Sequence, residues 1–386
     1  MAWARKLPSG KWQACYRDSA GGVRTAGTYP RQNQAKNEAA AAEKAERDLP
    51  TPAEAARLTW GDWRPRWEAS RMIAASTARA DARRLDIHLQ PYWGKRVLRS
   101  ITSEDVQQWV KVMAGTTTAR GQRMAPATVT LCYRLFSNSM KAAVKARVLA
   151  ATPCQQIALP EAGPAPDRYL EDDEEVAIFE HLDARDRFAA ELLVGTGMRL
   201  GEGFGTHWES VDLVRRTVLV NRSFDDGGGI MKAPKSYAQR VVPISMRLAE
   251  LLREELGERG PGRPAPIDYG DALRARTGLV LPGRDGMPMD SHAFRKRFHR
   301  AVGWASTGPD DARLPVGHVR VHDLRHTYAS RLVRAGVPLL QVKELLGHSS
   351  ITVTERYAHL AQSQWDGVRA VLDGPGRAAG RAAEAL

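Results

Sequence analysis

The chain has 386 residues, of which 43% are hydrophobic; this is more than one small core requires, so the sequence predicts two or three domains. Lys and Arg number 57 against 44 Asp and Glu, giving a formal net charge of +13, which favours a polyanionic partner. Three widely spaced cysteines form no pattern of a disulfide framework or zinc site, and no run approaches the roughly 18 apolar residues of a membrane span. Because the amino terminus is polar and lacks an apolar signal core, we expect a protein of the reducing cytoplasm without membrane association.

The first predicted domain is residues 1–50. Residues 3–29 alternate apolar and polar positions around a Gly-Gly turn, which predicts a small sheet, and the Ala-, Glu- and Lys-rich run 31–48 predicts a helix over one of its faces. Basic side chains remain on the strands: Arg5, Lys6, Lys11, Arg17 and Arg24. Because a ribbon of two or three strands is narrow enough for a major groove, we expect this domain to read DNA. A Pro-Thr-Pro sequence then predicts a linker.

Residues 57–158 are helical in pattern throughout and predict an all-α domain. Trp60, Trp63 and Trp67 recur at helical spacing, so we interpret them as core residues, with base stacking as the alternative. Basic residues close the domain at Lys141, Lys145 and Arg147. A solvated face and a phosphate contact fit these three equally well.

A Pro-, Ala- and Gly-rich stretch at 159–166 predicts a second linker, before a mixed α+β domain at 168–372. Strand-like runs at 216–224 and 240–244 interrupt its helices. Residues 373–386 have no apolar period and predict a disordered tail, with a partner-binding tail as the alternative. The predicted fold class is therefore multidomain and mainly α with small β elements: a small sheet plus helix, an all-α domain, and a mixed α+β domain.

The chemistry depends on six polar residues of the third domain, each within a short motif. They are Arg199 in GTGMRLGE, Lys235 in PKSYAQRVVPI, His322 and Arg325 in HDLRHTYAS, His348 in LLGHSS, and Tyr357 in TERYAHL. Any one of them alone fits a structural role, such as a surface ion pair, a helix cap or a core aromatic. Their joint order and local context indicate a function.

In that order the motifs resemble the tyrosine recombinase, or phage integrase, family. HxxR, LLGH and YxH match its carboxy-terminal signature, with 23 residues from Arg325 to His348 and nine from His348 to Tyr357. TGMRxGE and a lysine between two strands match it upstream. The resemblance covers the whole chain, and it implies that the three predicted domains are an arm-type DNA-binding domain, a helical core-binding domain and a catalytic domain.

The resemblance implies that Tyr357 attacks a DNA phosphate and forms a 3′-phosphotyrosyl intermediate. Arg199 and Arg325 suit the phosphate, because a guanidinium group is always charged and binds phosphate oxygens in a bidentate manner. A tyrosine with its ordinary pKa near 10 is a poor nucleophile at neutral pH, so it must lose its proton as it attacks. The general base that the family implies is His322.

The remaining implied roles concern the phosphate and the leaving group. His348 is implied to bond the phosphate, and Lys235 to act as general acid toward the leaving 5′-oxygen, which a lysine can do if its pKa is lowered near a cationic cluster. Lys232 stays a rival, although Lys235 has the serine after it that the family pattern asks for. Glu202 is expected to orient Arg199.

Local sequence predicts how these residues are presented. HDLRHTYASRLVRAG predicts a helix that ends at Gly336 and carries His322 and Arg325 on one face. Pro338 is expected to open the next helix and Gly347 to end it, followed by a short helix with the nucleophile.

Three further features have no predicted chemical role. His326 lies one step further around its helix and is interpreted as a packing or supporting residue. His207 in FGTHW stands where the family often has arginine, which concerns packing near Arg199. Residues 257–271 are rich in Pro and Gly and are expected to form a surface loop.

The sequence therefore predicts a site-specific DNA recombinase that integrates or excises a phage or other mobile element and needs no cofactor or metal. The expected partners are double-stranded DNA, with core-type and arm-type sites, and further copies of the chain in a homotetramer. An excisionase or other directionality factor and a host DNA-bending protein are expected accessories, in the cytoplasm and nucleoid of a bacterial host. The alternatives are a type IB topoisomerase-like enzyme, a catalytically inactive DNA-binding regulator and a DNA-bridging protein.

Overall fold

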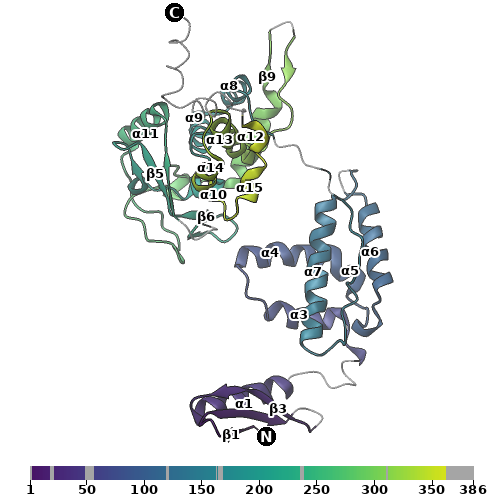
Figure 1. Ribbon diagram of the computed structural model, residues 1–386. Helices are drawn as coiled ribbons and strands as arrows, with labels where there is room; N and C mark the ends of the chain where they lie inside the picture. The colour runs from purple at the N-terminus through teal and green to yellow at the C-terminus, as the bar shows by residue number, and fades with distance from the viewer. Residues whose placement is uncertain are drawn as a thin grey trace, which may run out of the picture. The chain divides into compact units, whose positions relative to one another are not determined.

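The computed structural model describes residues 2–17, 21–47, 56–118, 121–161, 163, 168–234, 239–309 and 312–361 (Figure 1). Contacts within the chain divide it into two units, Met1–Ala165 and Pro166–Leu386. The first unit contains a small sheet and a group of helices, and the second contains the described residues of the predicted catalytic set.

The amino-terminal sheet is antiparallel, with strand order β1-β2-β3. Its strands are β1 (Trp3–Lys6), β2 (Trp12–Arg17) and β3 (Val23–Tyr29), and helix α1 (Gln32–Arg47) packs against all three. The buried contact is made by Ala14 of β2 with Ala35 and Ala39 of α1. Alanine has no side chain beyond Cβ, so the helix approaches the sheet closely but buries little apolar area. The expected sheet with one covering helix is present.

The helical group of the first unit follows. Its elements are α3 (Trp60–Ala69), α4 (Ala75–Arg84), the π-helical turn η1 (Leu85–Leu89), α5 (Gln90–Trp93), the short η2 (Leu98–Ser100), α6 (Ser103–Gly115) and α7 (Pro126–Lys145). Thr59 caps α3 and Thr102 caps α6, each in a reciprocal pair of hydrogen bonds with the aspartate three residues later.

Three tryptophans of α3 form one side of the helical core. Trp60, Trp63 and Trp67 are all buried, as their spacing predicts. The Trp60 indole donates to the Ser139 hydroxyl at 3.0 Å, and the Trp63 indole donates to the Ser139 carbonyl at 2.9 Å. Both indole N–H groups are thus satisfied inside the core, which ties α3 to α7 and confirms the packing interpretation.

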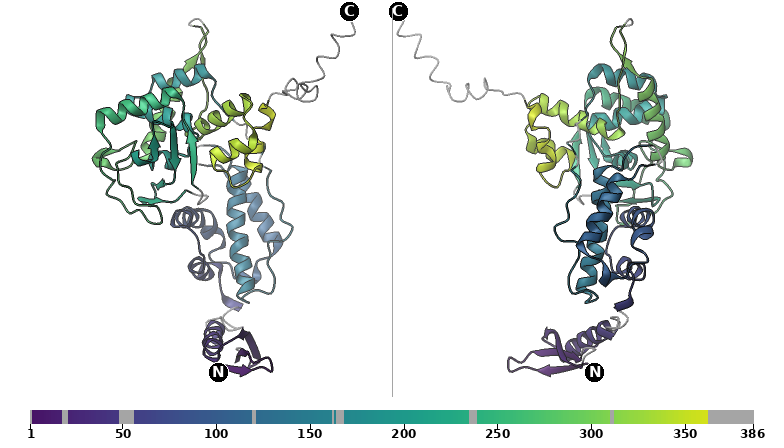
Figure 2. Two further views of the ribbon diagram at one scale, coloured as in Figure 1. Left: turned by 60° about the vertical axis from the view of Figure 1, so that its left-hand side comes forward. Right: turned by 90° about the vertical axis from the view of Figure 1, so that its right-hand side faces the viewer.

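The second unit is built mainly from helices. They are α8 (Asp172–Glu180), α9 (Ala184–Thr196), α10 (Leu200–Phe204), η3 (Trp208–Ser210), α11 (Met246–Arg259), η4 (Arg284–Gly286), α12 (Ser291–Trp304), α13 (Val321–Arg334), α14 (Leu339–Leu346), α15 (Thr352–Glu355) and η5 (Ala358–Leu360). The yellow carboxy-terminal helices stay together as one group in both views of Figure 2.

Short antiparallel strands complete the second unit. A three-stranded sheet has the order β4-β5-β8, from β4 (Val211–Asp212), β5 (Thr217–Val220) and β8 (Arg240–Pro243). Two hairpins are formed by β6 (Ser223–Asp225) with β7 (Ile230–Lys232) and by β9 (Ser306–Thr307) with β10 (Leu314–Pro315). Both strand-like runs of the sequence are therefore strands.

Helices α9 and α13 pack against each other in the core of the second unit. Gly197 ends α9 with φ 61°, and a Cβ built there would lie 2.4 Å from Cδ1 of Tyr328 on α13. Only glycine suits this position, because the backbone is left-handed and the Tyr328 ring occupies the space. The turn brings the segment that follows α9 close to α13.

The prediction that residues 257–271 form a surface loop is only partly correct. Helix α11 continues to Arg259, and Ala265 is buried in a small cluster with Met231 and Leu279. The Pro- and Gly-rich pattern described the irregular backbone correctly, but the stretch also contributes to a core. Within the described ranges, no helix is both long and apolar enough to cross a membrane.

Candidate active site

Arg199 lies at the start of α10, directly after the turn at Gly197. Its backbone N–H donates to Glu202 Oε2 at 2.9 Å, and its guanidinium donates to Glu202 Oε1, also at 2.9 Å. The side chain keeps 31% of its surface exposed. Glu202 therefore fixes the orientation of Arg199, as expected, while part of the guanidinium group stays open to a ligand.

Glu202 is shared with a second arginine, Arg240 at the start of β8. The Arg240 guanidinium donates to Glu202 Oε2 at 2.6 Å and to Oε1 at 3.3 Å, and its Nε donates to the Leu345 carbonyl at 2.7 Å. Burial acts to raise the pKa of Glu202, but hydrogen bonding and charge from Arg240, followed by Arg199, outweigh it and hold the pKa below its ordinary value. Glu202 is 1% exposed, so a buried carboxylate joins α10, β8 and the end of α14.

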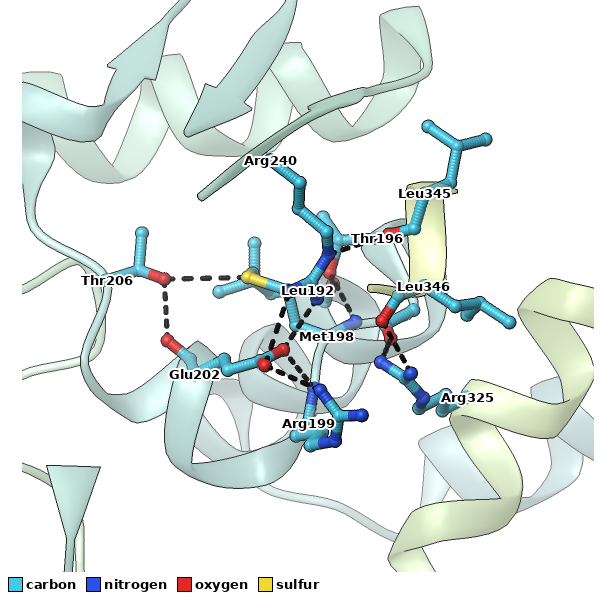
Figure 3. A network of polar contacts seen from close by, with 11 residues as sticks. Leu192, Thr196, Met198, Arg199, Glu202, Thr206, Arg240, Arg325, Leu345 and Leu346 are labelled. Carbon is cyan, nitrogen blue, oxygen red and sulfur yellow. Dashed lines mark hydrogen bonds and ion pairs between the residues drawn. The ribbon is translucent and has the colours of Figure 1, made fainter. Parts of the chain in front are cut away.

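Arg325 of α13 approaches the same region from the other side, as Figure 3 shows. Its two terminal nitrogens donate to the carbonyls of Gly197, at 2.7 Å, and Leu346, at 2.6 Å. Burial, followed by the charge of Arg199, lowers the pKa of Arg325 to about 9, so the group stays charged at neutral pH. Three guanidinium groups therefore gather around one carboxylate, and this excess of positive charge suits an anion.

His348 follows the left-handed Gly347 that ends α14. Its Nδ1 contacts the Thr354 hydroxyl at 2.9 Å. Withdrawal from solvent, followed by the charges of Arg325 and Arg199, lowers the pKa of His348 to about 3, so the ring is neutral at pH 7. If the Thr354 hydroxyl donates to Nδ1, the ring proton is on Nε2, which can then donate to an anion.

His322 lies in the first turn of α13 with its side chain exposed. Its ring meets the ring of His326 edge-on, with centroids 5.0 Å apart. Desolvation by the surrounding protein, followed by the charges of His326 and Arg325, lowers its pKa below the ordinary value. At neutral pH His322 is therefore uncharged and available to accept a proton.

Tyr357 lies between α15 and η5 and is only 2% exposed. Its hydroxyl is 2.5 Å from Nδ1 of His326, which is 6% exposed. The sequence interpretation gave His326 no chemical role, yet it contacts the predicted nucleophile. The signal that could have found it is its position four residues after His322, on the same face of α13.

Arg240 is the other residue that the sequence interpretation missed. It precedes the alternating run VVP, so a charged residue occupies an inward-facing position of a strand. An inward-facing arginine needs a buried anionic partner, and TGMRLGE supplies one in Glu202.

The predicted general acid, Lys235, lies outside the described residues. Its rival Lys232 is on β7, where its Nζ forms an ion pair with Asp225 Oδ2 at 3.0 Å. His207 is fully buried, and its two ring nitrogens contact the Gly205 carbonyl at 2.9 Å and the Tyr269 hydroxyl at 3.0 Å. His207 is therefore part of the packing, as predicted.

Comparison with known proteins places this geometry in a family. The model of the phage integrase family matches residues 168–364. Tyrosine recombinase XerC of Xylella fastidiosa (strain M23) is 31% identical over 222 residues, which cover 56% of this chain and 64% of the relative, so the match spans less than two thirds of that protein. Tyrosine recombinase XerC of Mycobacterium leprae (strain TN) is 30% identical over 298 residues, which cover 74% of this chain and 87% of the relative.

The fold is similar to that of a solved structure. A lambda integrase dimer bound to a COC′ core site matches with a TM-score of 0.59 and 19% identity, covering 94% of this chain and 96% of the other. This likeness confirms the predicted fold class, which is multidomain and mainly α with small β elements. On the family model and the Mycobacterium relative, the chain belongs to the phage integrase family, whose relatives here are named tyrosine recombinases.

Proposed function

We propose that the protein is a site-specific DNA recombinase that cleaves and rejoins DNA through a 3′-phosphotyrosyl intermediate on Tyr357. The observation that carries the proposal is the anion site: Glu202 holds the guanidinium of Arg199, and two backbone carbonyls hold the guanidinium of Arg325. If a scissile phosphate binds between the two arginines, their positive charges neutralise the negative charge that develops on its non-bridging oxygens during the reaction. The donors are already oriented, so little reorganisation is needed at the moment of reaction.

The proposed reaction follows from the chemistry of these groups. Tyr357 attacks phosphorus, His348 donates a hydrogen bond to a phosphate oxygen, and the bond to the 5′-oxygen breaks. By resemblance, we assign protonation of that leaving oxygen to Lys235 and acceptance of the tyrosine proton to His322. The phosphotyrosyl bond conserves the energy of the phosphodiester, so a second 5′-hydroxyl can reverse the step and rejoin the strand.

We also propose that two further domains bind the DNA, with boundaries at 1–50 and 57–158 and the catalytic domain at 168–372. The basic residues of the amino-terminal sheet support this, since Arg5, Lys6, Lys11, Arg17 and Arg24 are all exposed. Exposed cations at this density attract phosphate by a sequence-independent electrostatic term. Two DNA-binding domains on one chain raise the overall affinity for paired arm-type and core-type sites through effective concentration.

The proposed setting is a homotetramer on double-stranded DNA in the cytoplasm and nucleoid of a bacterium. The Xylella and Mycobacterium relatives come from bacteria, and recombination of two duplexes requires cleavage of four strands. An excisionase or other directionality factor and a host DNA-bending protein are the proposed accessories, because the resemblance to bivalent integrases implies them.

The test uses a pool of DNA duplexes with a randomised core and a nick beside each candidate cleavage position. Cleavage near the nick releases a short fragment that diffuses away, so the covalent complex accumulates. Full-length protein is incubated with the pool, captured in SDS, and the retained DNA is sequenced. We expect retained DNA with the wild type and none with Tyr357→Phe.

Two other outcomes would contradict the proposal in different ways. DNA that binds natively but is never retained in SDS would favour a DNA-binding regulator. Retention together with relaxation of plasmids that carry one unpaired site would favour a type IB topoisomerase-like activity.

A further inference from the structure

We propose that His326 is a further catalytic residue, which accepts the phenolic proton of Tyr357 as this residue attacks the phosphate. The inference rests on the proposed function and adds a proton acceptor to it. The sequence resemblance assigns this task to His322, whereas the hydroxyl contact described above is made by the histidine one helical turn later.

The geometry of α13 accounts for the contact. Residues four apart lie on one face of a helix, so His322 and His326 follow each other along α13, with Arg325 next to His326 in the chain. His326 Nδ1 lies 2.5 Å from Tyr357 Oη, which is a short hydrogen-bond contact. The ring centroids of the two residues are 5.9 Å apart.

Other polar groups of the site make their hydrogen bonds to different partners. Nδ1 of His348 contacts Thr354, and both terminal nitrogens of Arg325 donate to backbone carbonyls. His322 is exposed, and its ring meets that of His326 edge-on. His326 is thus the buried histidine at the reacting atom, and His322 lies on its solvent side.

The proton transfer balances without any further reagent. With the ring proton on Nε2, the Nδ1 lone pair of His326 accepts the hydrogen bond from the Tyr357 hydroxyl. As an oxygen lone pair of Tyr357 forms the bond to phosphorus, the O–H bond breaks and its proton moves to Nδ1. The bond from phosphorus to the 5′-oxygen then breaks, and its electron pair leaves with that oxygen, which takes a proton from the general acid. In the reverse step His326 returns its proton to the tyrosine oxygen.

The DNA phosphate favours this transfer. A proton on His326 adds positive charge next to Arg325, its neighbour on the same helix. The bound phosphate brings negative charge to the same place, so proton acceptance becomes favourable when the substrate is present.

The test compares His326→Asn with His326→Ala in the full-length protein. The amide group of asparagine occupies the place of Nδ1, so it can keep the hydrogen bond to Tyr357 but has almost no basicity. The substrate is the nicked duplex most strongly retained from the randomised pool, and the measured quantity is the rate of formation of the SDS-resistant adduct. His299→Asn, on the exposed surface of α12, is the matched control and is expected to react at the wild-type rate.

If His326 accepts the proton, both variants lose roughly 100-fold or more in rate while native DNA binding stays unchanged, since a positioned base contributes about 10²- to 10⁴-fold. A residue that only positions Tyr357 would leave His326→Asn close to the wild-type rate, which would overturn the proposal. Replacing Tyr357 with 2,3-difluorotyrosine, a more acidic phenol, should recover part of the rate in His326→Asn, because less basicity is then required. No recovery would also count against a base.

Adduct formation by the wild-type protein distinguishes failure of this proposal from failure of the proposed function. An adduct that depends on Tyr357 but forms equally fast in both His326 variants removes the role of His326 and leaves the recombinase proposal standing. If the wild type forms no adduct, the recombinase proposal fails and the role of His326 fails with it. Thermal unfolding of each variant shows whether a slow rate arises from a misfolded protein.

Discussion

The arginines and the tyrosine of the candidate site are held in different ways. Arg199, Arg240 and Arg325 have ionic or hydrogen bonds to Glu202 or to backbone carbonyls, and most of these atoms are buried. Tyr357 instead lies between α15 and η5, which have four and three residues. The phosphate-binding part is therefore held by buried ionic and carbonyl bonds, whereas the backbone around the nucleophile is held by short, local turn hydrogen bonds.

The largest effect is expected from removal of Glu202, the carboxylate that binds both Arg199 and Arg240. Glu202→Ala leaves the nearly buried Arg240 without its anionic partner, and removal of one partner of a buried ion pair costs about 3–5 kcal/mol. We expect the free energy of unfolding in denaturant to fall by about that amount and adduct formation to be lost. Glu250→Gln, at an exposed position of α11, is the control and should stay within about 0.5 kcal/mol of the wild type. A stable Glu202→Ala protein would mean that the arginines are held without this carboxylate.

A smaller effect is expected from Arg325→Lys, which keeps the charge but cannot reproduce two parallel donors. One of the bonds to Gly197 and Leu346 is lost, and the orientation of the cation toward phosphate is lost with it. Removal of one preorganised donor of this kind costs about 10²- to 10³-fold in the chemical step. Single-turnover adduct formation measures the rate, and native gel shifts should show nearly unchanged DNA binding. A rate equal to that of the wild type would show that charge alone suffices.

The segment that carries the nucleophile is tested by Thr354→Val, a change of similar shape that removes the hydroxyl contact with His348. A neutral hydrogen bond contributes about 1 kcal/mol, so we expect adduct formation to slow by roughly fivefold, with little change in DNA binding. Hydrogen exchange of residues 351–361 should become faster in the variant while that of α13 does not. Equal acceleration in both regions would contradict the distinction between the long helix α13 and the short helical turns around Tyr357.

The last expected effect concerns the pH dependence of stability rather than the rate of the reaction. Burial is the main cause that lowers the pKa of His207 to about 4, from an ordinary value of 6.5, so the unfolded chain binds more protons than the folded chain between these values. The free energy of unfolding should therefore decrease as the pH falls from about 6.5 toward 4, in the direction that proton linkage requires. His207→Gln should be less stable at pH 7 but lose less stability on acidification. Denaturant unfolding at several pH values measures both slopes, and identical slopes would assign the pH dependence to other groups.

The helices of the site could be predicted because their signals are local. The expected helix from HDLRHTYASRLVRAG is α13, and Gly336 follows it with φ 84°. The next helix, α14, begins after Pro338 and ends at Gly347, as the positions of these two residues predict. Caps and turns depend on neighbouring residues, so one stretch of sequence contains the information.

The roles of Arg240 and His326 could not be predicted in the same way. Arg240 meets Glu202, which is 38 residues away in the chain, and His326 meets Tyr357, which is 31 residues away. Such contacts depend on how β8, α13 and the carboxy-terminal segment pack together, and no local pattern states this. The burial of Ala265 in a Pro- and Gly-rich stretch was missed for the same reason.

Gly197 has a consequence for how the sequence can vary. Its missing Cβ makes room for the Tyr328 ring, and its carbonyl accepts the hydrogen bond from Arg325. One residue, Gly197, therefore affects both the packing of the Tyr328 ring and the position of the Arg325 guanidinium. A mutation there shifts the arginine and the aromatic ring together, so compensation at a second position must repair both at once. A substitution at this turn is therefore expected to impair both packing and the anion site, whereas a lost cap at an ordinary helix end costs stability alone.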